Sequence, residues 1–373
     1  MFNICLLVNN ITNSFSKKTN ALVYFSFLLY MLLEKIHDTN VHIMSSDFNF
    51  SDKISFLGKQ FNFCNFNLND IKNNKINIII EIFCCLKNET RLQIKQHIPQ
   101  LKYGLFQLGN PHYIDSSNFL YMGDTYNGTP RLYKKYYDFV WLLPQYERHI
   151  TYLKTMYKTE NVYIAPTLWE PYLIEFENNN ETIPITMDNI NIGIFEGNIL
   201  PTKTSIIPLY ICEAYNLKNQ NQNQNQKYNI NTVHLTNLQT FGKKQKFQNN
   251  LHELSIFENI IEVNNPVELV KYIKKNKINV IISHQIHNSL NALYFECLYF
   301  NIPLIHNSPE MKDYGYYYPE FDIEIGTQQL QNVIEDHDKQ RDLYNFNNKE
   351  VLKKFSIHNP KNIYKYMKLL NNI

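Results

Sequence analysis

Polar side chains gather at the ends of two predicted strands in the segment Ser283–Gly326. A buried strand ends at Ser283, and the turn after it is crowded with histidine, glutamine, asparagine and serine. A second short strand, Pro303–His306, is again followed by short polar side chains. Ligands of parallel sheets bind beyond the carboxyl ends of the strands, so these residues mark a candidate crevice. The candidate ligand-binding residues are His284, Asn288, Glu296, Asn307 and Ser308.

The residue types in this segment suit a nucleotide-diphosphate sugar. A helix capped by Asn288 or Ser289 would offer free amides and a positive dipole end to a diphosphate. Glu296 stands near the end of that helix and can accept both hydroxyls of a ribose. The histidines of the segment do not form a helical HxxxH pair, so a bound metal is disfavoured.

A second candidate phosphate site lies where the strand ending at Phe195 meets the next helix. The turn contains Glu196, Gly197 and Asn198, and Lys203 stands at the entrance to a helix over Thr204–Tyr215. A lysine beside free helix amides can neutralise the negative charge that grows on a departing diphosphate. A solvated first-turn lysine is the alternative reading of Lys203.

Several nucleotide-binding motifs are excluded. The first strand-to-helix turn, Asn9–Asn20, contains no glycine, so it cannot be a GxGxxG dinucleotide fingerprint. With 10 glycines in 373 residues, the chain has neither a P-loop nor a GxSxG elbow. A net charge of +2 and scattered lysine pairs argue against a nucleic-acid coat.

Composition and length predict a cytoplasmic, soluble protein of two domains. Single cores stop growing at roughly 250–300 residues, and 44% of this chain is hydrophobic. The run Ala21–Leu33 is too short for a membrane span, so we expect a buried helix. The six cysteines form no CxxC pair and are expected to be buried free thiols in a reducing compartment. Asparagine, lysine and tyrosine have AT-rich codons, so single residues of these types carry little weight.

Both halves of the chain alternate strand-like and helix-like segments, which predicts two Rossmann-like parallel sheets facing a central cleft. The expected domains are residues 1–170, 171–345 and a helical tail over 346–373 that packs back on the first domain. The tract Asn219–Gln226 reads as a polar surface loop. The fold class is therefore α/β with two parallel sheets.

The spacing from Asn288 to Glu296, followed by IPLIHNS, resembles the donor-site segment of retaining GT-B glycosyltransferases, which carry Glu-x7-Glu and a GxPV strand. Here Asn288 replaces the first glutamate and Asn301 the glycine. The chain more closely resembles a little-characterised GT-B-like family of bacteria and large DNA viruses. The matching pieces are LGN (108–110), WLLPQY (141–146), TLWEP (167–171), FEGN…K (195–203), ICEAY (211–215) and HNSP…DYGYYYP (306–319).

That resemblance implies a metal-independent, hexosyltransferase-like enzyme without a cofactor, whose co-substrate is a nucleotide sugar. Glu196, Asn198 and Lys203 would line the phosphate side of the donor. His284, Asn288, Asn307, Ser308 and Glu296 would surround the sugar and ribose. On the acceptor side would lie Asn9, Asn20, Gly109 and Asn110. A viral member would work in the host cytoplasm.

Other readings stay open on the sequence alone. A catalytically inactive module that binds a glycan or a partner would explain the missing glutamate at Asn288. A nucleotide-sugar epimerase would use the same fold. A glucosyltransferase acting on DNA is disfavoured by the near-neutral charge. No general base stands out, and Asp47, Asp115 and Asp124 are candidates by location alone.

Overall fold

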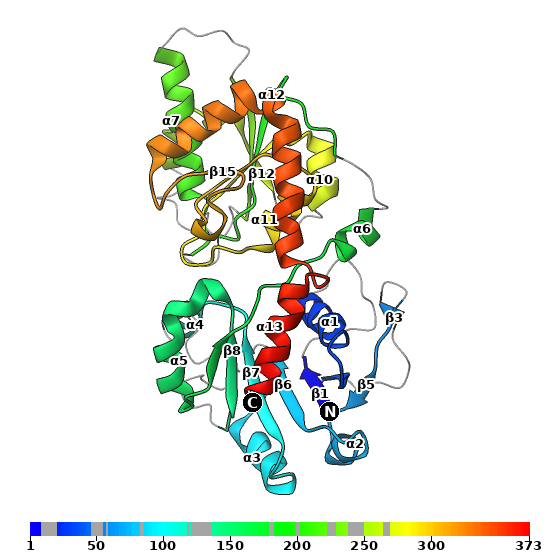
Figure 1. Ribbon diagram of the computed structural model, residues 1–373. Coiled ribbons are helices and arrows are strands. Elements are labelled where there is room, and N and C mark those ends of the chain that lie inside the picture. The colour runs from blue at the N-terminus through cyan, green and yellow to red at the C-terminus, as the bar shows by residue number, and fades with distance from the viewer. Residues whose placement is uncertain are drawn as a thin grey trace. The chain divides into compact units, whose positions relative to one another are not determined.

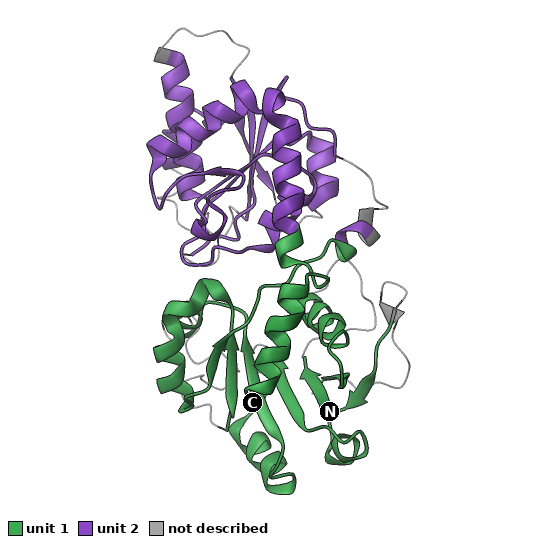
Figure 2. Ribbon diagram, viewed as in Figure 1, with its two compact units in different colours: residues 1–173, 353–373 green, residues 174–352 purple. Residues whose placement is uncertain are grey.

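The chain forms two compact units, Met1–Leu173 with Lys353–Ile373 and Ile174–Leu352 (Figure 2). Among the described helices, none combines the length and the apolar character needed to span a bilayer. The computed structural model describes residues 1–8, 21–45, 55–56, 59–82, 86–117, 120, 136–178, 183–198, 202–221, 229–237, 250–263 and 269–373.

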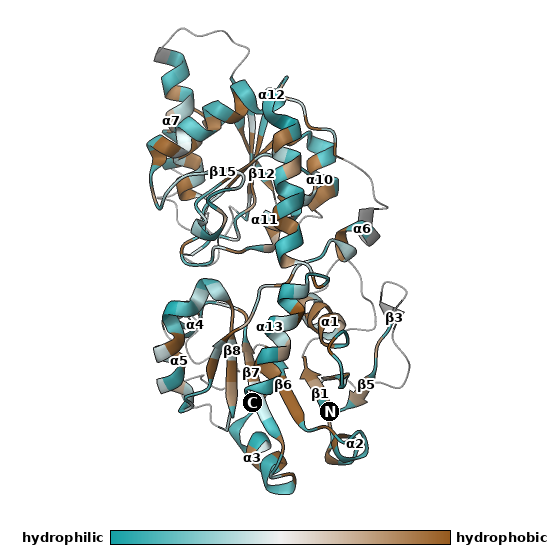
Figure 3. Cartoon of the chain, in the orientation of Figure 1, coloured by the Kyte–Doolittle hydropathy of each residue, from teal (hydrophilic) through white to brown (hydrophobic). Residues whose placement is uncertain are grey.

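The first unit is built on a seven-stranded parallel sheet whose strand order reverses between β1 and β6 (Figure 1). Strands covered on both faces read as continuous apolar runs, and β6 is buried at every position (Figure 3). In sheet order the strands are β5 (Phe63–Asn65), β2 (Thr39–Ser45), β1 (Phe2–Leu7), β6 (Ile78–Ile82), β7 (Lys102–Gln107), β8 (Phe139–Leu142) and β9 (Val162–Ile164). A separate hairpin pairs β3 (Ser55–Phe56) with β4 (Lys59–Gln60).

Helices supply the other layers of this unit. They are α1 (Ala21–Leu33), α2 (Leu68–Asn73), α3 (Asn88–His97), α4 (Pro111–Ser117), the 3-10 turn η4 (Pro144–His149), α5 (Ile150–Tyr157) and α13 (Pro360–Asn371). The C-terminal helix α13 packs against α1. Its Tyr366 ring lies 5.7 Å from the Trp141 ring, and its hydroxyl donates to the Pro166 carbonyl at 2.7 Å. The end of the chain is thereby fixed into the core of the first unit.

The second unit has a six-stranded parallel sheet with the strand order of a Rossmann fold. In sheet order the strands are β12 (Ile260–Val263), β11 (Ile230–Thr236), β10 (Ile190–Ile194), β13 (Val280–Ser283), β14 (Leu304–His306) and β15 (Tyr316–Tyr317). The order reverses between β10 and β13. The helices and turns are α6 (Tyr172–Asn178), α7 (Ile206–Asn221), η6 (Phe257–Asn259), α10 (Leu269–Asn276), α11 (Ala292–Tyr299), η7 (Pro309–Met311) and α12 (Ile323–Phe355).

The predicted alternation of strands and helices is confirmed in both halves, with three corrections. The helix expected from Asn288 begins at Ala292, and α7 extends to Asn221, into the tract expected to be a loop. The 33-residue helix α12 begins at Ile323, well before the helical tail expected from residue 346, because its sequence is too polar to show a strong apolar period. Tertiary packing, rather than local pattern, decides these boundaries.

A buried ion pair joins β6 to α3 in the first unit. Arg91 Nη1 donates to Glu81 Oε1 at 2.8 Å, and both side chains are fully buried. The same guanidinium nitrogen reaches the Leu86 carbonyl at 2.9 Å and the Tyr137 hydroxyl at 3.0 Å. Leu86 N–H and the Tyr137 hydroxyl donate hydrogen bonds to Glu81 Oε2 at 3.3 and 3.1 Å. These groups satisfy one another, which indicates a structural rather than a ligand-binding role.

Breaking this pair on one side should destabilise the first unit strongly. Arg91→Met leaves the Glu81 charge buried without its partner, so the free energy of unfolding should fall by about 3–5 kcal/mol. Replacing both charges, as in Glu81→Leu with Arg91→Met, should recover much of that loss. Urea denaturation followed by circular dichroism measures both variants.

The matched control is Lys154→Met, which breaks an exposed ion pair with Glu160. Exposed pairs contribute roughly 0–1 kcal/mol, so this variant should unfold close to the wild type. Equal losses for Arg91→Met and Lys154→Met would contradict a structural role for the buried pair.

Candidate functional site

The candidate site lies at the switch point of the second sheet, where β10 and β13 run side by side. Chains leaving neighbouring strands on opposite sides of a switch point open a crevice beyond their carboxyl ends. Glu196 follows β10, and Ser283, His284 and Gln285 end or follow β13. The sheet topology therefore brings together two sequence segments that lie almost ninety residues apart.

The loops that leave β10 and β13 are joined by backbone pairing. Lys203 forms an antiparallel bridge with Gln285, and Ile286 N–H donates to the Thr202 carbonyl at 2.9 Å. Asn198 N–H donates to the Lys203 carbonyl at 3.0 Å. Lys203 is thus held from both sides of the switch point, directly before α7.

Asn198 shapes the turn in front of Lys203. Its φ of 54° lies in the left-handed region, which asparagine tolerates better than most residues. Its Oδ1 accepts the Ser205 N–H at 2.8 Å, and its Nδ2 donates to the Thr236 carbonyl at 2.8 Å. The protein itself uses the Asn198 side chain, which makes this residue an organiser of the loop.

Glu196 is almost completely buried at 1% exposure. Its Oε1 accepts the Ser283 hydroxyl at 2.5 Å and the His284 N–H at 3.2 Å. Its Oε2 accepts the Gln285 amide at 2.5 Å. Burial raises the pKa of Glu196 to about 7, although these hydrogen bonds and the charge of Lys203 favour the ionised form.

Lys203 is the cation of the site. Burial lowers the pKa of its ammonium, and the charge of Glu196 opposes that shift. The two charges influence each other, yet among the described residues no ion pair or hydrogen bond engages Lys203 Nζ. A partly desolvated ammonium with no direct counter-ion is suited to an anionic ligand.

Gln285 connects several of the predicted residues, although it was not among the candidates predicted from the sequence. Its Oε1 accepts the Asn288 amide at 3.0 Å, and its N–H donates to Asn307 Oδ1 at 2.9 Å. Asn307 Nδ2 returns to the Gln285 carbonyl at 3.2 Å. No local motif marks this glutamine; its position directly after the candidate His284 was the available signal.

His284 carries one nitrogen without a partner. Its Nδ1 lies 2.9 Å from the Tyr318 hydroxyl, and its ring contacts the ring of Phe321 at 5.0 Å. Nε2 is buried and has no hydrogen-bond partner, while the residue is 1% exposed. Burial lowers the pKa of His284 to about 4, so the ring is neutral at pH 7.

His306 and Ser308 support the loop after β14. His306 Nε2 lies 2.8 Å from the Tyr314 carbonyl, and its Nδ1 accepts the Ser308 N–H at 3.1 Å. These partners fix one neutral tautomer, and burial lowers the pKa of His306 to about 4. The Ser308 hydroxyl donates to the Ser289 carbonyl at 2.6 Å. Both residues are used structurally.

Tyr294 of α11 faces this cluster, and Glu296 projects from a different side of the same helix. The Tyr294 hydroxyl lies 3.2 Å from Ser283 Oγ, and residues two apart on a helix do not share a face. The helix is capped by Asn291, whose side chain accepts the Leu293 N–H at 3.2 Å. The expectation that Asn288 or Ser289 forms this cap was wrong.

Two of the four predicted acceptor-side residues, Asn9 and Asn20, lie outside the described residues, as do Asp47 and Asp124. The Gly109 carbonyl accepts the Gln107 amide at 2.8 Å. Asn110 Oδ1 accepts the Tyr113 N–H at 3.1 Å, at the start of α4. Asp115 is buried and accepts the Tyr152 hydroxyl at 2.7 Å.

In the part of the chain that the structure describes, no three His, Cys, Asp or Glu side chains are placed to hold a metal ion. Four cysteines are free and buried, as expected, namely Cys5, Cys64, Cys212 and Cys297. Cys84 and Cys85 lie outside the described residues.

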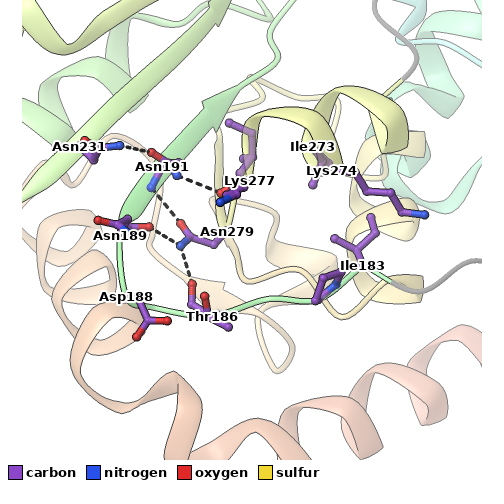
Figure 4. Close-up of a pocket in the computed structure, with 12 residues that line it drawn as sticks. Ile183, Thr186, Asp188, Asn189, Asn191, Asn231, Ile273, Lys274, Lys277 and Asn279 are labelled. Atoms are coloured by element: carbon purple, nitrogen blue, oxygen red, sulfur yellow. Dashed lines mark hydrogen bonds between the residues drawn. The ribbon is translucent and has the colours of Figure 1, made fainter.

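A pocket of about 840 Å³ lies at the opposite, amino end of the second sheet (Figure 4). The Asn279 amide donates to the Thr186 and Asn189 carbonyls at 2.6 and 2.5 Å, and its Oδ1 accepts the Asn191 N–H at 2.9 Å (Figure 4). Asn191 Oδ1 accepts the Asn231 amide at 2.8 Å. These side chains tie strand entrances together, and the ligands of such sheets bind at the other end.

The chain belongs to the family described as "Protein of unknown function (DUF2827)", whose profile matches residues 17–370. No curated protein matches the sequence. Solved structures show that the fold is that of GT-B glycosyltransferases.

Three of these structures illustrate the similarity. Sucrose-phosphate synthase from Thermosynechococcus elongatus is 11% identical, with a TM-score of 0.57 over 100% of this chain and 98% of that one. A glycosyltransferase from Rickettsia africae is 12% identical, with a TM-score of 0.59 over 100% and 99%. A structure described as trehalose-6-phosphate from E. coli bound with UDP-2-fluoro glucose is 10% identical, with a TM-score of 0.62 over 100% and 99%.

The buried titratable groups predict lower stability in mild acid. His284, His306 and His337 each have a pKa lowered to about 4 by burial, so the unfolded chain takes up their protons first. Each should remove about 2 kcal/mol from the free energy of unfolding between pH 7 and pH 5. Glu196, with its pKa raised to about 7, acts in the opposite direction by about 2 kcal/mol. We expect a net loss of roughly 3–4 kcal/mol in urea denaturation.

Two variants test whether the buried histidines cause this pH dependence of the free energy of unfolding. His337→Phe removes a buried imidazole and should flatten the pH dependence of stability. His37→Asn changes an imidazole that is 92% exposed and should leave the pH dependence unaltered. A wild type whose stability rises steadily from pH 7 to pH 5 would contradict the assignment of these histidines.

Proposed function

We propose that this protein is a nucleotide-sugar glycosyltransferase whose second unit binds the donor. The observation that supports this proposal most is the position of Lys203. Backbone pairing with Gln285 and Asn198 fixes this residue at the switch point of a Rossmann-type sheet. Its ammonium is partly desolvated and has no direct counter-ion among the described residues. An anionic group is the ligand that such a cation would stabilise most.

The neighbouring elements support a diphosphate as that anion. Helix α7 begins at Ile206, immediately after the Lys203 loop, and α11 begins at Ala292 after the loop that follows β13. The first N–H groups of a helix lack intrahelical partners and favour negative charge. Lys203 and these amides would neutralise the leaving diphosphate without a metal ion or cofactor.

In the sugar-binding part of the proposed site, His284 offers a buried Nε2 that has no protein partner. Asn288, Asn307 and Ser308 would act by holding the loops in place, since their described hydrogen bonds run to the protein itself. The first unit would carry the acceptor, with Gly109 and Asn110 near the carboxyl end of β7. The four buried free thiols suit a reducing compartment such as the cytoplasm.

Two of the similar structures agree with this proposal. The E. coli structure described above holds UDP-2-fluoro glucose, and WaaG is described as a glycosyltransferase of lipopolysaccharide biosynthesis, with a TM-score of 0.51. Both proteins share the fold of this chain, and each is 10% identical to it in sequence.

A second candidate function is sugar or partner binding without turnover. The observation that favours it is Asn288, which stands where the resemblance expects a glutamate and gives its amide to Gln285 at 3.0 Å. Donor binding with no transfer and no hydrolysis across a broad acceptor panel would select this alternative. Release of free nucleotide together with sugar transfer would select the transferase.

Substitution of Lys203 tests the donor site. Lys203→Met keeps most of the apolar stem and removes the charge, so the Kd for UDP or GDP should rise about 10–100-fold. Isothermal titration calorimetry measures the Kd for both nucleotides. Lys275→Ala in α10 is the matched control, because it removes an exposed lysine from the same unit and should leave the Kd unchanged. Binding that survives in Lys203→Met, or no binding of either nucleotide to the wild type, would refute the donor site.

A further inference from the structure

A carboxyl group stands beside the cation that is expected to bind an anion. Glu196 is buried at 1% exposure, and its charge and that of Lys203 shift each other's pKa. An ionised Glu196 therefore repels the same ligand that Lys203 attracts. At the switch point, the charge of the site is set by whether Glu196 carries a proton.

The groups around Glu196 can accommodate either protonation state. When Glu196 is ionised, the Ser283 hydroxyl donates to Oε1 at 2.5 Å. When it is protonated, the O–H can donate back to Ser283 Oγ, which then turns its own proton toward the Tyr294 hydroxyl at 3.2 Å. The Gln285 amide donates to Oε2 in both states. No atom of the loop has to move far for the proton to bind.

We propose that an anionic diphosphate binds at Lys203 together with one proton, which is taken up by Glu196. This inference rests on the proposed function and names the residue that sets the charge requirement of the same site. The proton comes from the solvent and forms an O–H bond on the Glu196 carboxylate, and no bond of the ligand is made or broken.

The other titratable groups that face Glu196 do not compete for this proton. Tyr294 from α11 and Tyr318 after β15 have pKa values raised well above their usual range by burial, so both stay neutral. His284 after β13 has a pKa lowered to about 4 and is also neutral at pH 7. Lys203, before α7, remains the single opposing charge facing Glu196 among the described residues.

A bound diphosphate raises the affinity of Glu196 for the proton in two ways. It adds negative charge near the carboxylate, and it engages the ammonium whose charge favours ionisation. Glu196 has a pKa raised to about 7, so it is mostly ionised at pH 7.5 in the free protein and would become protonated in the complex. The expected uptake is about 0.7 proton per ligand bound at this pH.

Calorimetric titration in buffers of different ionisation enthalpy measures this uptake directly. UDP, GDP and inorganic pyrophosphate are each titrated at pH 7.5 into the full-length wild type, Glu196→Gln and Glu262→Gln. The slope of binding enthalpy against buffer ionisation enthalpy gives the number of protons exchanged. Protonation of the ligand itself is common to all three proteins, so the difference between wild type and Glu196→Gln isolates Glu196.

We expect the wild type and Glu262→Gln, which changes an exposed carboxyl in β12, to take up about 0.7 proton more than Glu196→Gln. Equal proton numbers in all three proteins would overturn the inference and leave the proposed donor site standing. Uptake with pyrophosphate but no binding of either nucleotide would support the inference and overturn the proposed function. No binding of any of the three anions would overturn both.

A second measurement keeps the test valid if Glu196→Gln does not fold. Difference infrared spectra of the wild type with and without pyrophosphate should show a new C=O band of a protonated, buried carboxylic acid. The band should shift when the glutamate residues are labelled with carbon-13. Absence of such a band at saturating pyrophosphate would overturn the inference.

Discussion

The second unit depends most on the Glu196 carboxylate, which is buried between two loops and held there by hydrogen bonds. Ser283 and Gln285 donate to it from the end of β13, while its own backbone follows β10. A buried carboxylate persists only when its oxygens are satisfied, so the two loops must stay in register. The backbone bridge between Lys203 and Gln285 joins the same two loops and places Lys203 at the switch point.

The polar residues of this candidate site fall into two groups by their hydrogen bonds. The described hydrogen bonds of Asn198, Asn307, His306 and Ser308 run to neighbouring groups of the protein itself. Lys203 Nζ and one nitrogen of His284 make no such bond among the described residues. The first group gives the loops a single conformation, and the second group remains available for a ligand. Preorganised loops lower the entropic cost of binding at the groups that they position.

Asparagine serves the second sheet at both ends. At the amino end, Asn191 and Asn279 tie strand entrances to the preceding connector; at the carboxyl end, Asn198 and Asn307 tie the loops. An amide side chain mimics a peptide group, donating and accepting at once, and can therefore replace missing backbone pairing. The compositional bias toward asparagine hid these roles in the sequence, where each residue resembled many others.

The sequence by itself determined the alternation of strands and helices, because apolar runs covered on both faces leave a local pattern. It also predicted that Glu196 and His284 follow strands and that Lys203 precedes a helix, because such local patterns are visible in one dimension. Only the tertiary structure decided that Gln285 connects these residues, that Asn291 caps α11, and that Glu196 faces inward. The roles of Gln285 and Glu196 depend on β10 and β13 being neighbours, and pairing between distant strands leaves no trace in either segment alone.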